Sequence, residues 1–113
     1  MMRVQLLMFA VTASLAVSAC IGGTDYAKNP RRFDAQQWGA ALGGDRCDMV
    51  DDLRERVGLE GRGRAEVIAL LGEPETHGDP PDHYHLCPSS MDVWILEIDW
   101  ENGRVASTRI RDT

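Results

Sequence analysis

A stretch of eleven residues, HGDPPDHYHLC from His77 to Cys87, holds side chains that could bind a metal ion: three histidines, two aspartates and a cysteine. Zn²⁺ takes three or four nitrogen, sulfur or oxygen ligands. His83 and His85 would share one face of a strand, because side chains two residues apart point the same way. His77 could reach them from the preceding loop. This stretch is therefore the first place to look for chemistry.

A purely structural interpretation of the same stretch is available, and we favour it. Pro80 and Pro81 turn the chain into a strand in which Tyr84 and Leu86 are buried and the histidines are exposed. A disulfide at Cys87 would also remove the only thiolate ligand. We therefore predict no metal site and no other cofactor.

Catalytic motifs are weak in the rest of the chain. Ser89 and Ser90 lack the surroundings of a nucleophile elbow and are typical of a turn. Glu97 and Asp99 share a strand face and could act as an acid pair, but alternating acids on a solvated strand are more common. No glycine-rich phosphate loop follows a strand. The sequence predicts neither an enzyme nor a small-molecule substrate.

The N-terminus has the features of a bacterial lipoprotein signal peptide, residues 1–19. It contains one arginine, no acid and an apolar run too short to span a bilayer. The segment ends in VSAC, which resembles a lipobox. This resemblance implies that Cys20 carries acyl chains such as palmitate and becomes the mature N-terminus. A plain secretory signal is the alternative. Aspartate directly after the acylated cysteine commonly retains lipoproteins in the inner membrane. Here isoleucine follows Cys20, so we expect a lipid anchor in the outer membrane, facing the periplasm.

The two other cysteines, Cys47 and Cys87, would then lie in an oxidising compartment. We predict that they form a disulfide, with two free buried thiols as the alternative. The loop closed by this bond is about forty residues, for which chain entropy predicts a stabilisation of roughly 3 to 4 kcal/mol.

The charge of the chain argues against nucleic-acid binding. Lys and Arg number 12 and Asp and Glu number 18, which gives a net charge of −6. Nothing in the sequence supplies the concentrated basic face that phosphate binding requires.

Residues 20–44 are predicted to be the lipidated N-terminus and a flexible tether. They contain glycine, proline and charges of both signs, and their apolar residues follow no regular repeat. A short helical turn is expected at about residues 35–42. Phe33 and Trp38 are large aromatic residues that a flexible tether does not require. We expect them to pack on the domain or, alternatively, to bind a partner.

Residues 45–113 are predicted to form an α+β domain. Met49, Leu53 and Val57 repeat at helical spacing and predict a helix over residues 46–57. A second helix ends at Gly72, just before a proline that cannot continue it.

Three strands should follow: residues 83–87, residues 93–100 and, after an Asn102-Gly103 hairpin turn, residues 103–112. One sheet face would carry Leu96, Ile98, Trp100 and Val105 and lie against the helices. The other face would carry Ile95, Ala106, Thr108 and Ile110 and is too apolar for a solvated surface, so it is a candidate contact site.

The segment from residue 45 to 111 resembles the SmpA/OmlA, or BamE-like, family of small outer-membrane lipoproteins. The resemblance rests on GRGRAEVIALLGEP followed by LEIDWENGRV, where family positions are matched by Gly61, Val67, Leu71, Gly72 and Pro74. Gly63 replaces the usual capping alcohol and is a tolerable cap. The resemblance implies a two-layer sandwich, with two short N-terminal helices packed on a three-stranded antiparallel meander, as in a beta-lactamase inhibitor protein.

Two functions follow as expectations. In the first, a lipid-anchored structural or interaction module serves outer-membrane assembly or envelope maintenance. It would bind an envelope protein through Phe33, Trp38, Ile95 and Ile110. In the alternative, the protein is a periplasmic inhibitor or ligand-binding module.

Overall fold

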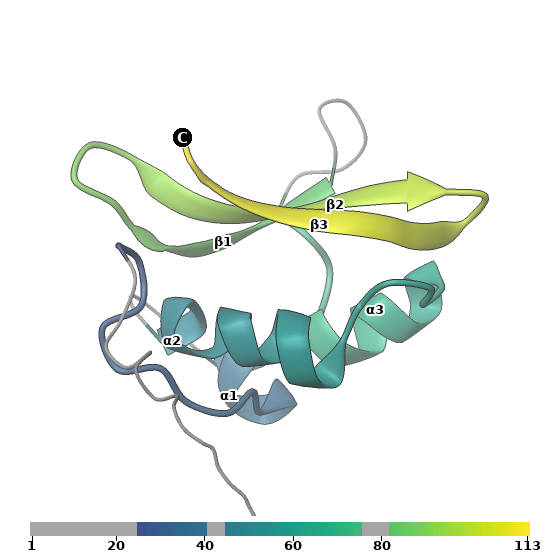
Figure 1. Ribbon diagram of the computed structural model, residues 1–113, viewed down its shortest axis with the longest axis horizontal. Coiled ribbons are helices and arrows are strands. Elements are labelled where there is room, and N and C mark those ends of the chain that lie inside the picture. The colour runs from purple at the N-terminus through teal and green to yellow at the C-terminus, as the bar shows by residue number, and fades with distance from the viewer. Residues whose placement is uncertain (1–24, 41–44, 76–81) are drawn as a thin grey trace, which may run out of the picture.

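The computed structural model describes residues 25–40, 45–75 and 82–113, which form a layer of helices against a sheet (Figure 1). The helices are α1 (Ala35–Ala40), α2 (Asp45–Asp52), the π-helical turn η3 (Leu53–Val57) and α3 (Arg64–Leu71). The strands are β1 (Asp82–Pro88), β2 (Val93–Glu101) and β3 (Arg104–Asp112). They form an antiparallel sheet in the order β1-β2-β3. The predicted two-layer α+β fold is confirmed.

The first predicted helix is present as α2 followed by η3. Its last turn is wider than an α-helical turn, since the Gly58 N–H donates to the Leu53 carbonyl five residues back, at 2.8 Å. Gly58 has φ +80°, a conformation that favours glycine and ends the helix. Met49, Val50 and Leu53 are fully buried, so the predicted apolar stripe faces the sheet.

Helix α3 begins and ends with glycine. Glu66 reaches back so that its carboxylate accepts the Gly63 N–H at 2.9 Å, which is the half of a capping box that needs no alcohol side chain. At the other end, the Gly72 N–H donates to the Ile68 carbonyl, and the Tyr84 hydroxyl donates to the Gly72 carbonyl at 2.7 Å. These contacts hold α3 under β1.

The turn between β2 and β3 is the predicted one. Asn102 and Gly103 both have positive φ, +55° and +78°, as a type I′ turn requires. Glu101 pairs with Arg104 and Trp100 with Val105, as expected from a two-residue loop.

Two bulges interrupt the sheet, and neither is visible in the sequence pattern. In β1, the pairing with β2 shifts between His85 and Cys87, so Leu86 is an extra residue. In β3, Ser107 pairs with Asp99 but Val105 pairs with Trp100, so Ala106 is extra. An extra residue reverses the alternation of side chains beyond it. Residues on the far side of each bulge therefore face opposite to the simple prediction.

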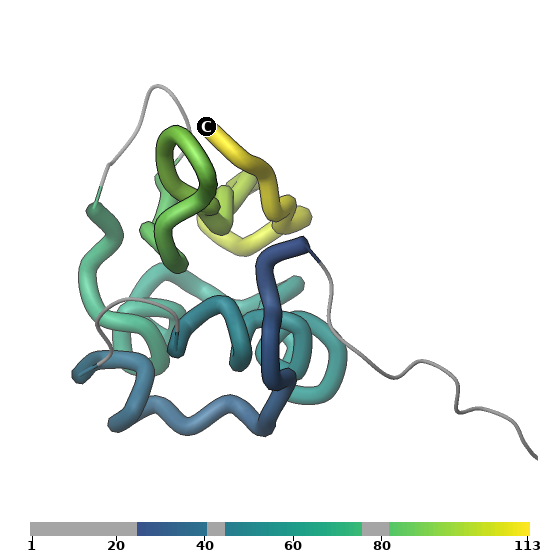
Figure 2. Tube along the Cα trace, turned by 90° about the vertical axis from the view of Figure 1, so that its left-hand side faces the viewer, coloured from purple at the N-terminus to yellow at the C-terminus, as the bar shows by residue number. Residues whose placement is uncertain are grey.

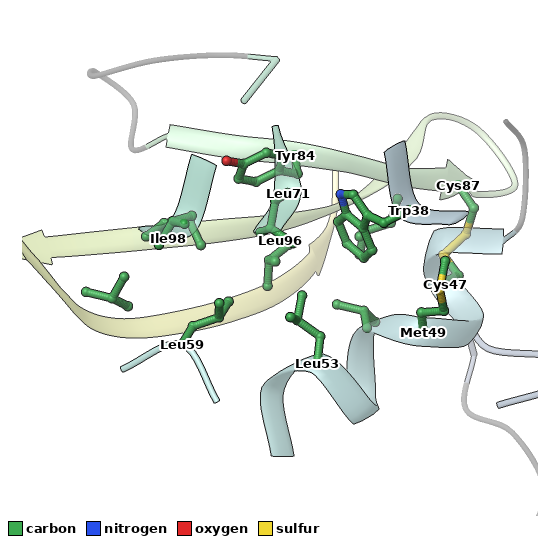
Figure 3. Close-up of a cluster of buried hydrophobic side chains, with 14 residues drawn as sticks. Trp38, Cys47, Met49, Leu53, Leu59, Leu71, Tyr84, Cys87, Leu96 and Ile98 are labelled. Atoms are coloured by element: carbon green, nitrogen blue, oxygen red, sulfur yellow. A yellow bond between two sulfur atoms is a disulfide. The ribbon is translucent and has the colours of Figure 1, made fainter. Parts of the chain in front are cut away.

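The hydrophobic core includes the N-terminal segment. Trp38 of α1 is 0 % exposed and contacts Tyr84 of β1, with ring centroids 6.5 Å apart, in the cluster shown in Figure 3. Figure 2 shows the segment from residue 25 passing along the helical layer. Residues 25–40 are thus packed on the domain, so the prediction of a flexible tether is wrong for them. The rest of the predicted tether, residues 20–24 and 41–44, lies outside the described residues.

Backbone groups at both outer edges of the sheet have partners. On β1, the His83 carbonyl accepts the Glu75 N–H, the His85 N–H donates to the Glu75 carboxylate, and the His85 carbonyl accepts from Arg46. On β3, Val105 exchanges hydrogen bonds with residues 61–62, and the Thr108 carbonyl accepts from Arg54.

Candidate interaction sites

His83 and His85 lie on the sheet face that points away from the helices, where they pair with Glu97 and Ile95 of β2. The rings of His83 and His85 are stacked, with centroids 5.7 Å apart and an interplanar angle of 21°. Across residues 25–40, 45–75 and 82–113, no group of three or more His, Cys, Asp or Glu side chains is placed to hold a metal ion. His77 lies outside the described residues.

Cys47 and Cys87 form the predicted disulfide, with their Cα atoms 5.9 Å apart (Figure 3). The bond joins α2 to β1 across the two layers. It depends on the bulge at Leu86, because uninterrupted alternation would have placed Cys87 on the histidine face, away from α2.

The prediction that the outer sheet face is an apolar contact site is wrong. Ile95 lies on the outer face but is 0 % exposed, so it offers no surface to a partner. Ile110 pairs with Leu96 and packs against the core, because the bulge at Ala106 turns it and Thr108 toward the helices. The Arg54 side chain accordingly donates to the Thr108 hydroxyl at 2.9 Å.

Charged groups occupy the outer face instead. Glu97, with its side chain 3 % exposed, accepts hydrogen bonds from Arg109 at 2.6 Å and Arg111 at 2.8 Å. Burial raises the pKa of Glu97, but the two guanidinium groups outweigh that effect and hold its pKa below its ordinary value. The arginines bridge β2 and β3 above Ile95, so the face is an ion-pair network.

The two aromatic residues of the predicted tether pack inward. Trp38 is fully buried, and half-buried Phe33 packs against it with ring centroids 5.8 Å apart. Packing on the domain was the favoured prediction for both residues and is confirmed. A partner contact through Trp38 is excluded by its burial.

The acids of the first predicted helix hold the N-terminal segment, a role that the sequence analysis missed. The Asp48 carboxylate accepts the backbone N–H groups of Lys28 and Asn29, at 3.0 and 3.1 Å, and Asp52 accepts that of Phe33 at 2.7 Å. A hydrogen bond from Arg56 lowers the pKa of Asp52. The only signal in the sequence was the run of acids itself, which is equally typical of a solvated helix face.

A second missed cluster lies under the β2–β3 end of the sheet. The buried carboxylate of Asp82 accepts hydrogen bonds from Arg64 at 2.6 Å and from the Trp100 indole at 3.0 Å. The Arg64 guanidinium also lies over the Trp100 ring, 4.3 Å from its centroid. These contacts fix α3 to the sheet.

A cleft of about 720 Å³ opens at the opposite end of the domain, beside the β1–β2 hairpin. We call it the hairpin-end cleft. Its lining comes from four places: residues 25, 26, 28 and 29, the first turn of α2, residues 87–90 of the β1–β2 hairpin, and the pair Trp94 and Asp112. The Ser89 hydroxyl accepts the Asp92 N–H at 3.0 Å, so this serine belongs to a turn, as predicted.

Cys20, the predicted lipidation site, lies outside the described residues. None of the helices in the described ranges is long and apolar enough to cross a membrane.

Comparison of the chain with protein-family models, with curated proteins and with solved structures finds no match. The geometry of the domain and the features of its sequence therefore carry the functional argument.

Proposed function

We propose that the protein is an envelope lipoprotein, anchored by acylated Cys20 in the outer membrane and facing the periplasm, that acts as a structural or interaction module. The observation that carries this proposal is the distribution of the three cysteines. Cys47 and Cys87 are paired with each other inside the domain. Cys20 alone remains, and it directly follows an apolar segment whose ending resembles a lipobox.

Features of the domain support an interaction role. The outer sheet face is an ion-pair network, the core is filled by side chains, and the hairpin-end cleft offers a partner a concave surface. The resemblance to the SmpA/OmlA family adds outer-membrane assembly as the specific process.

The anchor is tested by expressing the full chain and the variant Cys20→Ser in a Gram-negative host. We expect the wild-type protein in the membrane fraction, with an acylated N-terminal cysteine detected by mass spectrometry. The variant should lose both the acyl mass and the membrane association. An unmodified N-terminus in the wild-type protein would overturn the proposal.

The process is tested by affinity capture of the lipidated protein from detergent-solubilised envelopes. Recovery of outer-membrane assembly subunits supports the assembly role, provided that their molar ratio to the protein stays constant when the sample is diluted. Recovery of a single hydrolase whose activity the protein blocks would instead establish the inhibitor alternative.

A further inference from the structure

The hairpin-end cleft combines an aromatic wall with carboxylates. Tyr26 and Trp94 form the wall, with ring centroids 5.4 Å apart and planes tilted by 58°. The lining also includes four aspartates, Asp25, Asp45, Asp48 and Asp112, and a single lysine, Lys28. The side chain of Asp45 is 59 % exposed, although Arg31 lies 3.8 Å from its carboxylate, and Asp25 and Asp112 are exposed. The cleft is therefore lined for a positively charged ligand, which carboxylates attract and aromatic faces stack on.

The other two tryptophans show which cation these aromatic surfaces accept. Arg46 lies over the Trp38 ring at 5.0 Å, and Arg64 lies over the Trp100 ring at 4.3 Å. Trp94 has no such cation among the described residues, although it is half-buried and lines an acidic cleft. The pattern within this molecule points to a guanidinium or ammonium group that comes from another molecule.

An exposed methionine lies next to the cleft. Met91, at the tip of the β1–β2 hairpin, is 93 % exposed and follows the lining residue Ser90. It is the one large apolar side chain that the described residues expose to this degree. Methionine is a flexible side chain that adapts to protein partners. The site therefore suits a peptide segment better than a free cation.

The position of the cleft relates it to the membrane. Asp25 lines the cleft and is the fifth residue after Cys20. A chain of five residues spans at most about 18 Å even when fully extended. A lipid on Cys20 thus keeps the cleft close to the leaflet surface.

We propose that the hairpin-end cleft docks a flexible, arginine- or lysine-rich segment of a partner protein, with one cation stacked on Trp94 and others paired with Asp45 and Asp112. The membrane-adjacent location of that segment rests on the proposed anchor, whereas the chemistry of the cleft does not.

The test uses the full lipidated protein in a non-ionic detergent and two fluorescein-labelled dodecapeptides, one of alternating arginine and glycine and one of alternating glutamate and glycine. Fluorescence anisotropy should show binding of the arginine peptide only. The double variant Asp45→Asn, Asp112→Asn should weaken this binding about tenfold, because two exposed ion pairs are lost. Trp94→Phe should weaken it several-fold, since phenylalanine is a poorer partner for a cation than tryptophan.

The matched control is Glu60→Gln with Glu101→Gln, which removes the same charge from exposed residues at the β2–β3 end. It should change the affinity by less than about twofold. An equal loss in both double variants would show attraction to net charge only and overturn the proposal, as would failure of the wild-type protein to distinguish the two peptides. Circular dichroism confirms that each variant is folded.

The same preparation separates this inference from the anchor. Peptide binding by a protein without an acyl group supports the cleft and refutes the anchor. An acylated protein that ignores the arginine peptide refutes the cleft and leaves the anchor standing.

Discussion

Glu97 shows how one residue can be misjudged from its neighbours in sequence. In the alternating pattern of β2 it is a polar residue on the outer face, which suggests exposure. It is in fact 2 % exposed as a residue and accepts hydrogen bonds from two arginines of β3. A buried carboxylate held in this way must stay ionised to keep its contacts.

The stability of the protein should therefore fall in acid through Glu97. Its pKa is lower in the folded protein than in the unfolded chain, where a glutamate titrates near 4.3, so its contribution is complete above about pH 5. The contribution is lost as the pH falls through the folded-state pKa. Urea unfolding at several pH values should show this loss in the wild-type protein and a smaller one in Glu97→Gln. Glu101→Gln, exposed on the same strand, should keep the wild-type slope.

Trp38 packs on the domain as predicted, but its place inside the core could not be inferred from the sequence. The sequence places it in a glycine-containing stretch before the first predicted helix, yet it is at the centre of the core (Figure 3). Trp38→Ala should lower the free energy of unfolding by about 3 to 5 kcal/mol, because it leaves a large cavity. Gln36→Ala, exposed on the same helix, should change it by less than about 0.5 kcal/mol. Equal stability of the two variants in urea titrations would show that α1 does not belong to the domain.

At the scale of elements, the bulge at Ala106 decides which side of β3 meets the helices. Deleting Ala106 would let Ser107 follow Val105 in regular alternation, so the side chains beyond the bulge would keep their present faces. We expect this deletion variant to unfold in one cooperative urea transition, followed by tryptophan fluorescence, and to lose less than about 2 kcal/mol of stability. Deletion of an ordinarily paired residue would instead turn every later side chain to the wrong face. Ala106→Ser keeps the extra residue and should unfold like the wild-type protein. A deletion variant without a cooperative transition would contradict the role of Ala106 as the extra residue.

The elements themselves were predictable, and their faces only partly so. Local signals predicted both helices and the hairpin: apolar spacing at Met49 and Leu53, glycine at residue 72, and Asn102-Gly103. Bulges have no such signal, because an extra residue such as Ala106 is compatible with either face. Ile110 was therefore assigned to the wrong surface. The hairpin-end cleft was equally unpredictable, since it brings Tyr26 and Trp94 together from opposite ends of the chain.

For the whole molecule, the disulfide links the helical layer to the sheet. Its loop spans a sequence separation of 40 residues, so reduction should lower the free energy of unfolding by about 3 to 4 kcal/mol. Urea titrations of the oxidised protein and of the reduced, alkylated protein measure this difference. Electrophoresis with and without reductant confirms the state of each sample. Identical midpoints would show that the packing of Cys47 and Cys87 alone holds the layers together.

The partners of the sheet edges matter most when many copies of the protein share one surface. Anchored molecules diffuse in two dimensions and collide repeatedly in similar orientations, a condition that promotes strand-to-strand association through open edges. Here Glu75 and Arg46 occupy β1, while residues 61–62 and Arg54 occupy much of β3. If Cys20 carries the proposed lipid, crowding in a leaflet therefore need not lead to polymerisation, and the protein could accumulate there while remaining available to other molecules.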